Sequence, residues 1–324
     1  MPEHPTSFVA NITRTLYGFE PQSIEALDQH PFDWRGIYRL RDAQGDEWLM
    51  RLAYPAEQAD WLTSAAQLLD WLAQQHYPAP AVRVTTSQQR VGLSDGWAII
   101  LLSYVEGSML GRSSAGDLQA FAATVGRLHS LQVDQSAMLP QSRSHPDTIA
   151  TASQQLAQHG AHIPLEFQAL ATNLHVSMCA LQQQLPQQLC ITHGDCWYQN
   201  AIKTSAGQIV LIDWDCAGVG LPLLDLGNLL LTTHFDLSQP LLLEPNEASI
   251  KAIIHGYQQQ RQITTAERAC LADAMRFLLA FQLGSYVVEE TLTQHADLPF
   301  VLQKLRARYQ ATQPIADIAT RYFV

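Results

Sequence analysis

The chain has few charged residues and no cluster of basic ones. Of its 324 residues only 15% are charged, and 19 Lys and Arg stand against 30 Asp and Glu, a formal net charge of −11. Because nucleic-acid backbones require clustered cations, we expect no nucleic-acid partner. No apolar run approaches the roughly 18 residues of a membrane helix, and the first ten residues lack the features of a secretion signal. We therefore expect no membrane partner and a cytoplasmic location.

The sequence also lacks two common signatures. Its five cysteines, at positions 179, 190, 196, 216 and 270, form no Cys-x-x-Cys pair and show no histidine spacing typical of zinc, so we expect reduced thiols. The absence of Gly-x-x-x-x-Gly-Lys excludes Walker-type nucleotide chemistry. With 47% hydrophobic residues, the chain is long enough for a large core or two lobes.

What the chain does contain is a segment rich in polar functional groups after position 190. Asp195 is followed five positions later by Asn200, and Asp213 ends an apolar run. Residues 201–203 and 209–212 favour strands and are separated by turn residues, which predicts a β-hairpin. Pairing across this turn sets Asn200 opposite Ile212 or Asp213, and opposed residues lie within about 5.5 Å at Cβ, so we expect the Asn200 amide to meet the Asp213 carboxylate. Their oxygens suit a Mg²⁺ ion that holds phosphate oxygens, with Asp195 beside it.

The same spacing occurs in the catalytic loop of the protein-kinase superfamily. Residues 193–200, His-Gly-Asp-Cys-Trp-Tyr-Gln-Asn, most closely resemble the aminoglycoside phosphotransferase family and its relatives, the choline and homoserine-type small-molecule kinases. The triplet Ile212-Asp213-Trp214 and the segment 220–227, with Pro222 and Asp225, are similar to later motifs of that family. The three motifs occur in the family's order.

The resemblance implies a two-lobed, protein-kinase-like α+β fold. We expect a small antiparallel β-rich N-terminal lobe with one main helix over residues 1–105, which binds the nucleotide. A larger, mainly helical C-terminal lobe over residues 106–324 would carry the catalytic loop and the substrate site.

The resemblance also implies an activity, the ATP-dependent transfer of the γ-phosphate to a hydroxyl of a small molecule. Asp195 would accept the hydroxyl proton or orient the hydroxyl, and Asn200 and Asp213 would hold Mg²⁺. His193 would brace the catalytic loop. Asp225 would either accept backbone N–H bonds from that loop or cap the helix beginning near residue 226. The acceptor would be aminoglycoside-, amino-sugar-, choline- or homoserine-like, and the acidic composition favours a cationic one.

Nucleotide-binding residues are expected in the first lobe. Arg51 occupies the strand position where the family has a phosphate-binding Lys, and it is either a phosphate ligand or a strand residue facing solvent. Ser103, Tyr104 and Val105 resemble the linker whose backbone receives adenine. The loop 30–36 has one glycine where the family has a glycine-rich phosphate cover.

The predicted helix 60–73 departs from the family pattern. The resemblance aligns Ala65 with a glutamate that pairs with the strand cation, and Glu57 and Asp60, one to two turns earlier, are candidates to substitute for it. This departure motivates an alternative function, a catalytically silent, kinase-like nucleotide-binding regulator.

Five other polar residues have two interpretations each. Asp215 is a third metal ligand or, as we favour, a solvated carboxylate; His129 is a structural histidine rather than a ligand; and Cys196 is a small filler rather than a nucleophile. Glu289 and Glu290 either meet an amino group of the acceptor or lie on a solvated helix face, the safer interpretation.

Two other enzyme classes are disfavoured. Asp213 and Asp225 lie twelve positions apart, which leaves no room for the activation segment of a protein kinase. A metallo-hydrolase using His193 would need a second histidine nearby.

Periodicity predicts the remaining elements. We expect strands at 37–40, 47–53, 81–84 and 97–105, and helices at 117–131, 167–185, 247–260, 266–290 and 298–311. Residues 132–165 show no clear periodicity and are expected to form a mobile loop near the site.

Overall fold

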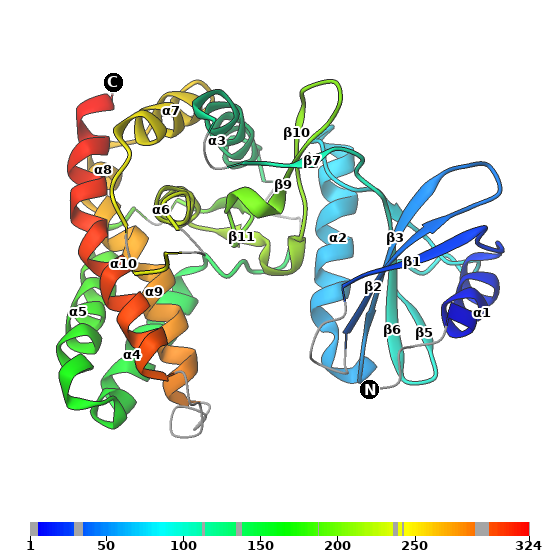
Figure 1. The fold of residues 1–324 in the computed structure, drawn as a ribbon, viewed down its shortest axis with the longest axis horizontal. Coiled ribbons are helices and arrows are strands. Elements are labelled where there is room, and N and C mark those ends of the chain that lie inside the picture. The colour runs from blue at the N-terminus through cyan, green and yellow to red at the C-terminus, as the bar shows by residue number, and fades with distance from the viewer. Residues whose placement is uncertain are drawn as a thin grey trace. The chain divides into compact units, whose positions relative to one another are not determined.

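The protein folds into two compact units. The computed structural model describes residues 6–28, 35–111, 114–133, 138–186, 188–235, 239–241, 243–288 and 298–323. Unit 1 comprises Met1–Ser108, Met138–Pro140 and Thr204–Cys216, and unit 2 comprises Met109–Ala137, Gln141–Lys203 and Ala217–Val324. Unit 1 is built around an antiparallel sheet and unit 2 is mostly helical (Figure 1), which confirms the predicted α+β fold class.

Unit 1 contains a six-stranded antiparallel sheet in the order β1-β2-β3-β6-β4, with β5 paired to β6. Its strands are β1 (Ser23–Asp28), β2 (Arg35–Arg41), β3 (Glu47–Ala53), β4 (Val82–Arg83), β5 (Gly92–Ser94) and β6 (Trp97–Ser103). The predicted hairpin over residues 37–53 is β2 and β3. Strand β1 was not expected, because its sequence, Ser-Ile-Glu-Ala-Leu-Asp, contains few β-branched or aromatic residues.

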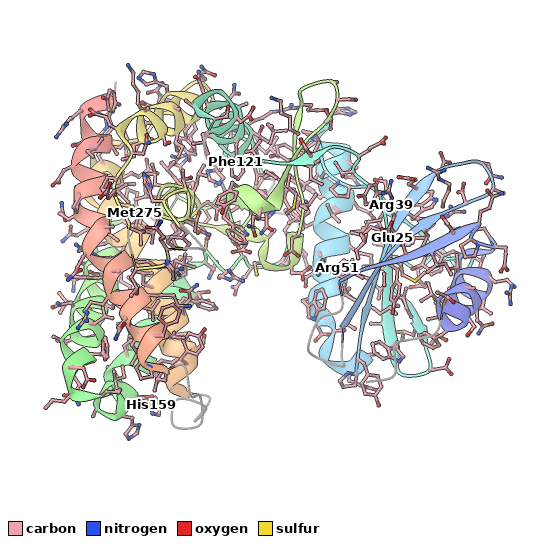
Figure 2. The ribbon with its side chains drawn as sticks, viewed as in Figure 1. Glu25, Arg39, Arg51, Phe121, His159 and Met275 are labelled. Carbon is pink, nitrogen blue, oxygen red and sulfur yellow. The ribbon has the colours of Figure 1, made fainter. Side chains whose placement is uncertain are left out.

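The two faces of this sheet are covered by different helices. On one face, α1 (Thr6–Tyr17) packs Val9 and Ile12 against Met50 and Leu52 of β3. Because side chains alternate along a strand, Arg51 points to the opposite face. That face carries α2 (Asp60–Gln74), and Figures 1 and 2 show α1 and α2 on opposite sides of the sheet with Arg51 toward α2.

The rest of unit 1 consists of short elements. These are η1 (Ala56–Gln58), β10 (Ile209–Leu211) and η5 (Trp214–Cys216). Strand β7 (Ser108–Met109) lies where the chain passes from unit 1 into unit 2.

Unit 2 is a bundle of helices that also contains short strands. The helices are α3 (Ala115–His129), α4 (Pro146–His159), α5 (Gln168–Gln184), α6 (Pro222–Thr232), α7 (Glu247–Gln258), α8 (Thr265–Ala269), α9 (Leu271–Val288) and α10 (Leu298–Ala319). The strands are β8 (Cys190–Thr192), β9 (Ala201–Lys203) and β11 (Gly218–Gly220), and the 3-10 turns are η2 (Gly160–His162), η3 (Leu165–Phe167), η4 (Tyr198–Asn200) and η7 (Thr320–Tyr322).

The prediction of a mobile loop over residues 132–165 is wrong, because α4 lies within it. Pro146 occupies the first turn, and the ring of His145 accepts the Asp147 N–H at 3.2 Å, which caps the helix. Ile149 and Leu156 are buried. The helical period was obscured because Gln, Ser, Thr and His fill most of the other positions.

Helix α6 is the centre of unit 2. Every one of its residues is buried, and Figure 1 shows it end-on among the other helices of the unit. Gly227 permits the close approach of α9, since a Cβ there would lie 2.8 Å from the carbonyl carbon of Ala274. Asp225, in the first turn of α6, is therefore a carboxylate in the interior of the unit. Within the described residues, no helix is long and apolar enough to cross a membrane.

Candidate active site

The predicted catalytic loop follows β8 in unit 2. Strand β8 pairs antiparallel with β11, and Thr192 lies opposite Gly218. Immediately after β8 the chain turns sharply at Gly194, whose φ of +75° is a left-handed conformation that glycine adopts without strain. The turn ends the strand and presents Asp195 at its edge.

The side chain of Asp225 stabilises this turn by hydrogen bonds. Its carboxylate accepts the N–H of His193 at 2.6 Å, the N–H of Gly194 at 3.0 Å and the hydroxyl of Ser144 at 2.9 Å. The thiol of Cys196 also donates to it at 3.4 Å. Burial raises the pKa of Cys196 well above its ordinary value, so the thiol is a packed, inert group. Helix α6 begins at Pro222 rather than near residue 226, and the backbone N–H groups bound by Asp225 are those of the loop.

A buried hydrogen-bond chain extends from this carboxylate. Burial alone would raise the pKa of Asp225, but bonds from His129 and from the loop outweigh it, and the pKa lies below its usual value. An ionised carboxylate only accepts, so Nε2 of His129 donates to Asp225 at 3.2 Å and Nδ1 accepts the Tyr257 hydroxyl at 2.7 Å. Burial lowers the pKa of His129, although Asp225 opposes this effect. His129 is thus a neutral structural histidine.

Asp195 has two polar partners within unit 2. Nδ2 of Asn200 donates to Oδ2 of Asp195 at 2.9 Å and to its backbone oxygen at 3.1 Å. The Arg143 guanidinium donates to Oδ1 at 3.0 Å. The Asp195 side chain remains 30% exposed. It is a carboxylate fixed on both oxygens yet open to solvent, as a group that meets a substrate must be.

Arg143 is itself held in place. On one side of it the Ser142 N–H donates to Val219 O at 3.0 Å, and on the other the Leu221 N–H donates to Ser144 O at 2.8 Å, so its segment lies along β11. Its guanidinium lies 5.2 Å from the Phe281 ring centroid, within reach of a cation–π contact. The sequence analysis did not select this residue. One signal was present, since Arg143 is the one Lys or Arg between positions 127 and 203.

A second group of charged residues lies in unit 1. The Arg51 guanidinium binds both oxygens of Asp215, at 2.6 Å and 2.5 Å, and lies 3.4 Å from Oδ1 of Asp213. Burial alone would lower the pKa of Arg51, but the two carboxylates outweigh it and the pKa is raised. The Arg51 side chain is 11% exposed and that of Asp215 is 15% exposed. Two earlier interpretations are therefore wrong, since Arg51 does not face solvent and Asp215 is not a solvated carboxylate.

Asp213 has the chemistry of a metal ligand. Its φ of +62° is uncommon for a residue other than glycine, and such conformations concentrate at functional sites. Its side chain is 46% exposed. In unit 2, the recorded side-chain bonds of Asn200 both use Nδ2, which leaves Oδ1 for a cation. Two oxygen donors fit Mg²⁺, which usually takes one or two protein ligands together with phosphates and water. Among the described residues, no group of three or more His, Cys, Asp and Glu is placed to hold a metal alone.

The meeting of Asn200 with Asp213 stays a prediction. Asn200 belongs to unit 2 and Asp213 to unit 1. The turn between them is formed as expected, with the Thr204 N–H donating to Gln208 O at 2.9 Å and the Gly207 N–H to Thr204 O at 2.9 Å. Gly207 has a φ of +79°, which suits this turn.

The three linker residues differ in their backbone bonds. The Ser103 N–H donates to Ala81 O at 2.8 Å and the Tyr104 N–H donates to Glu47 O at 3.0 Å. Within the described part of the chain, no hydrogen bond is recorded for the N–H of Val105. Val105 is therefore the linker residue with a donor for a ligand.

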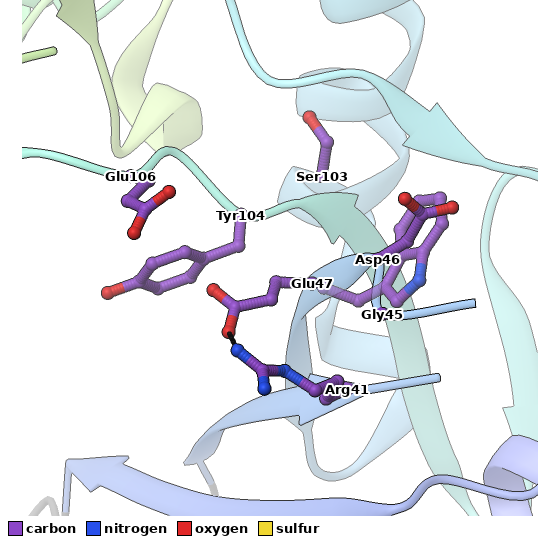
Figure 3. A pocket seen from close by; sticks show the side chains of 8 residues that line it. Arg41, Gly45, Asp46, Glu47, Ser103, Tyr104 and Glu106 are labelled. Carbon is purple, nitrogen blue, oxygen red and sulfur yellow. Dashed lines mark hydrogen bonds and ion pairs between the residues drawn. The ribbon is translucent and has the colours of Figure 1, made fainter. Parts of the chain in front are cut away.

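A pocket of about 520 Å³ lies beside this linker in unit 1 (Figure 3). It is lined by Arg41, Gly45, Asp46, Glu47, Trp48, Ser103, Tyr104 and Glu106. Arg41 donates to Glu47 at 2.8 Å across it. Its carboxylates outnumber its cation, so the pocket is a poor place for phosphates.

Two predicted features lie outside the described residues. Glu289 and Glu290 fall in the gap after position 288, and most of the loop 30–36 falls in the gap before position 35.

Unit 1 is β-rich and carries a buried cation on its central strand, and unit 2 is helical and carries a His-Gly-Asp loop. These features are typical of a kinase-like phosphotransferase. The sequence profile of the phosphotransferase enzyme family, APH, matches residues 29–269, more than half of the chain. The chain belongs to this family and is a small-molecule kinase. No curated protein matches it.

Solved structures share the fold over nearly the whole chain. An amicoumacin kinase, hAmiN, solved with AMP-PNP and Ca²⁺, has 17% identity and a TM-score of 0.71, with 96% of this chain and 95% of that one covered. An aminoglycoside phosphotransferase from Alicyclobacillus acidocaldarius has 16% identity and a TM-score of 0.69, with 99% and 97% covered. A microcompartment-associated aminopropanol kinase has 16% identity and a TM-score of 0.68, with 98% and 99% covered.

Proposed function

We propose that the protein transfers the γ-phosphate of ATP to a hydroxyl of a small molecule, using Asp195. The observation that carries the proposal is the state of this carboxylate, which is bound on one oxygen by Asn200 and on the other by Arg143, and is still open to solvent. Phosphoryl transfer depends mainly on positioning and charge neutralisation, so a fixed, accessible carboxylate suits it.

Asp195 orients the acceptor hydroxyl and accepts its proton as the hydroxyl oxygen bonds to the γ-phosphorus and the bond from that phosphorus to the bridging oxygen breaks, releasing ADP. Arg143 fixes the carboxylate and places a positive charge beside the reacting groups. Asp225 keeps the loop rigid, because the N–H groups of His193 and Gly194 are bound to a buried charge.

Asn200, through Oδ1, and Asp213, through its carboxylate, would hold Mg²⁺. When bound, this ion neutralises negative charge on the phosphate oxygens. The proposal requires both residues to reach one ion, and the all-oxygen donor set and the unusual backbone of Asp213 support it.

Unit 1 supplies the residues that bind the adenine base and the phosphate groups of the nucleotide. The N–H of Val105 donates to adenine, and the backbone of Ser103 and Tyr104 borders it. Arg51 contacts the phosphate tail, which its position on β3 and its remaining N–H groups support.

A cationic hydroxyl compound is the acceptor class that the charge balance favours, because the net charge of −11 attracts cations. The neighbour named as an aminopropanol kinase is, by its name, a kinase of an amino alcohol, which agrees with this class. We place the reaction in the cytoplasm, where ATP is supplied.

The test is an acceptor screen coupled to ADP release. Purified protein with Mg²⁺ and ATP is offered aminoglycosides, amino sugars, choline and homoserine, beside the Asp195→Asn variant. We expect acceptor-dependent ADP release from the parent and a drop of at least about a hundredfold in the variant. ATP binding with equal, negligible turnover in both proteins would instead support the silent nucleotide-binding regulator.

A further inference from the structure

The pairing of Arg51 with Asp215 answers a question that the sequence raises. A kinase-like strand cation is normally held by a glutamate on the neighbouring helix, and the sequence resemblance aligns Ala65 of α2 with that position. Neither Glu57 nor Asp60 appears among the recorded partners of Arg51. The carboxylate comes instead from η5, 164 positions later in the chain.

Helix α2 contributes an aromatic ring in place of a carboxylate. Trp61 lies with its ring centroid 5.1 Å from the Arg51 guanidinium carbon. Residues 61 and 65 are four apart and therefore share one face of the helix. The guanidinium is thus bounded by a ring from α2 and bound by a carboxylate from η5.

The short helix η5 is anchored to the same unit. The Trp214 indole N–H donates to Leu211 O at 3.0 Å, and its ring meets Tyr77, just beyond α2, edge-on at 6.1 Å between centroids. This anchoring fixes Asp215, which follows directly. Asp213 precedes it in the left-handed conformation, which turns the chain between the two carboxylates.

We propose that Asp215 is the positioning residue for the phosphate-binding cation and replaces the helix glutamate of other kinases. The inference rests on the proposed function. It also explains why the strand residue is Arg. Only a planar fork can bind both oxygens of Asp215 and still offer further N–H groups to a phosphate tail.

The geometry distinguishes this role from metal binding. Both oxygens of Asp215 are bound to the guanidinium at hydrogen-bond distance, whereas Asp213 has one oxygen near it at 3.4 Å and is far more exposed. Asp213 is therefore the ligand for a cation, and Asp215 orients Arg51.

The experiment compares Asp215→Asn, Arg51→Met and the double variant with the parent. Dissociation constants are measured by calorimetry for Mg²⁺-ATP and for adenosine, which lacks the phosphate tail. Asp70→Asn is the matched control, because Asp70 forms an ion pair with Arg90 elsewhere in unit 1. We expect each single variant to weaken ATP binding roughly ten- to a hundredfold, and the double variant to bind no worse than Arg51→Met. Adenosine affinity and the control should stay within about twofold of the parent.

Three results would overturn the inference. They are unchanged ATP affinity in Asp215→Asn, effects that multiply in the double variant, and an equal loss of adenosine affinity, which would indicate a merely structural role. A third measurement tests metal binding, because the Mg²⁺ concentration for half-maximal ATP binding should rise in Asp213→Asn and stay unchanged in Asp215→Asn. A rise in both would make Asp215 a metal ligand. If the parent binds ATP normally but transfers no phosphate, the proposed function fails and the pairing is still tested by these constants.

Discussion

The substitution Asp225→Asn tests whether one buried carboxylate holds the catalytic loop. In the parent, its two oxygens accept two backbone N–H groups, a hydroxyl and an imidazole N–H. Asparagine has the same shape but one acceptor oxygen. In either orientation its NH₂ group faces one of the donors, either the His193 N–H or the Gly194 N–H.

The expected cost follows from the lost bonds. A hydrogen bond to a buried charge contributes roughly 1.5–3 kcal/mol, and a buried donor left unpaired costs about 1–3 kcal/mol. Because the network shares its donors, these effects do not add in full, and together they amount to about 3–5 kcal/mol. We expect Asp225→Asn to lower the free energy of unfolding of unit 2 by this amount.

The assay is urea denaturation followed by circular dichroism, with amide hydrogen exchange to locate the change. Peptides covering residues 190–196 should exchange faster in the variant, whereas β6, in unit 1, should exchange as in the parent. Asp147→Asn is the matched control, since this aspartate is also in a first helical turn of unit 2 but its side chain is 76% exposed. A loss no larger than that of the control, or unchanged exchange in the loop, would refute the role assigned to Asp225.

Four further substitutions test other parts of unit 2. Burial lowers the pKa of His129, so below about pH 6.5 the unfolded chain binds a proton there more readily than the folded chain. The free energy of unfolding should therefore fall with decreasing pH, by at most about 1.4 kcal/mol per pH unit. His129→Gln should flatten this pH dependence in urea titrations, and an unchanged slope would contradict the assignment. Gly256→Ala should cost about 1–3 kcal/mol, because its Cβ would lie 2.1 Å from the Gln119 carbonyl oxygen, whereas Gly116→Ala, with its nearest atom at 3.9 Å, should stabilise by about 0.5–1 kcal/mol. Arg143→Leu should lower kcat about tenfold or more with ATP affinity unchanged, and a loss confined to ATP affinity would place this arginine on the nucleotide instead.

The parts of the site formed by residues close together in the sequence were predictable, because the spacing of those residues fixes which side chains meet. Asp195 and Asn200 are five positions apart in one loop, so the pattern itself brings them together. The helices with clear apolar periods, such as 60–73, were predictable for the same reason. Helix α4 was missed because its buried positions are separated by small polar residues that give a weak period.

The partners of the charged groups were not predictable, because they come from distant positions. Arg51 and Asp215 are 164 residues apart, and Arg143 and Asp195 are 52 apart. No local pattern encodes such pairs, which depend on how the sheet and the β11 segment place them. The sequence did show that the helix 60–73 has Ala65 where a carboxylate partner for Arg51 was expected. It did not show which residue supplies that carboxylate.

These pairs give the candidate site a common electrostatic design. Arg51 and Arg143 each lie in a long stretch without another Lys or Arg, positions 42–82 and 128–202 respectively. Each is bound to a carboxylate of its own unit, so its orientation is fixed before any ligand arrives. A free arginine side chain carries about 2 kcal/mol of rotamer entropy, and a held one loses less on binding phosphate. On an acidic chain that otherwise repels anions, we propose that such held cations determine where a nucleotide and a transferring phosphoryl group bind. The carboxylates that hold them are therefore part of the proposed catalytic apparatus, and this includes Asp215, which holds Arg51 but would touch neither nucleotide nor acceptor.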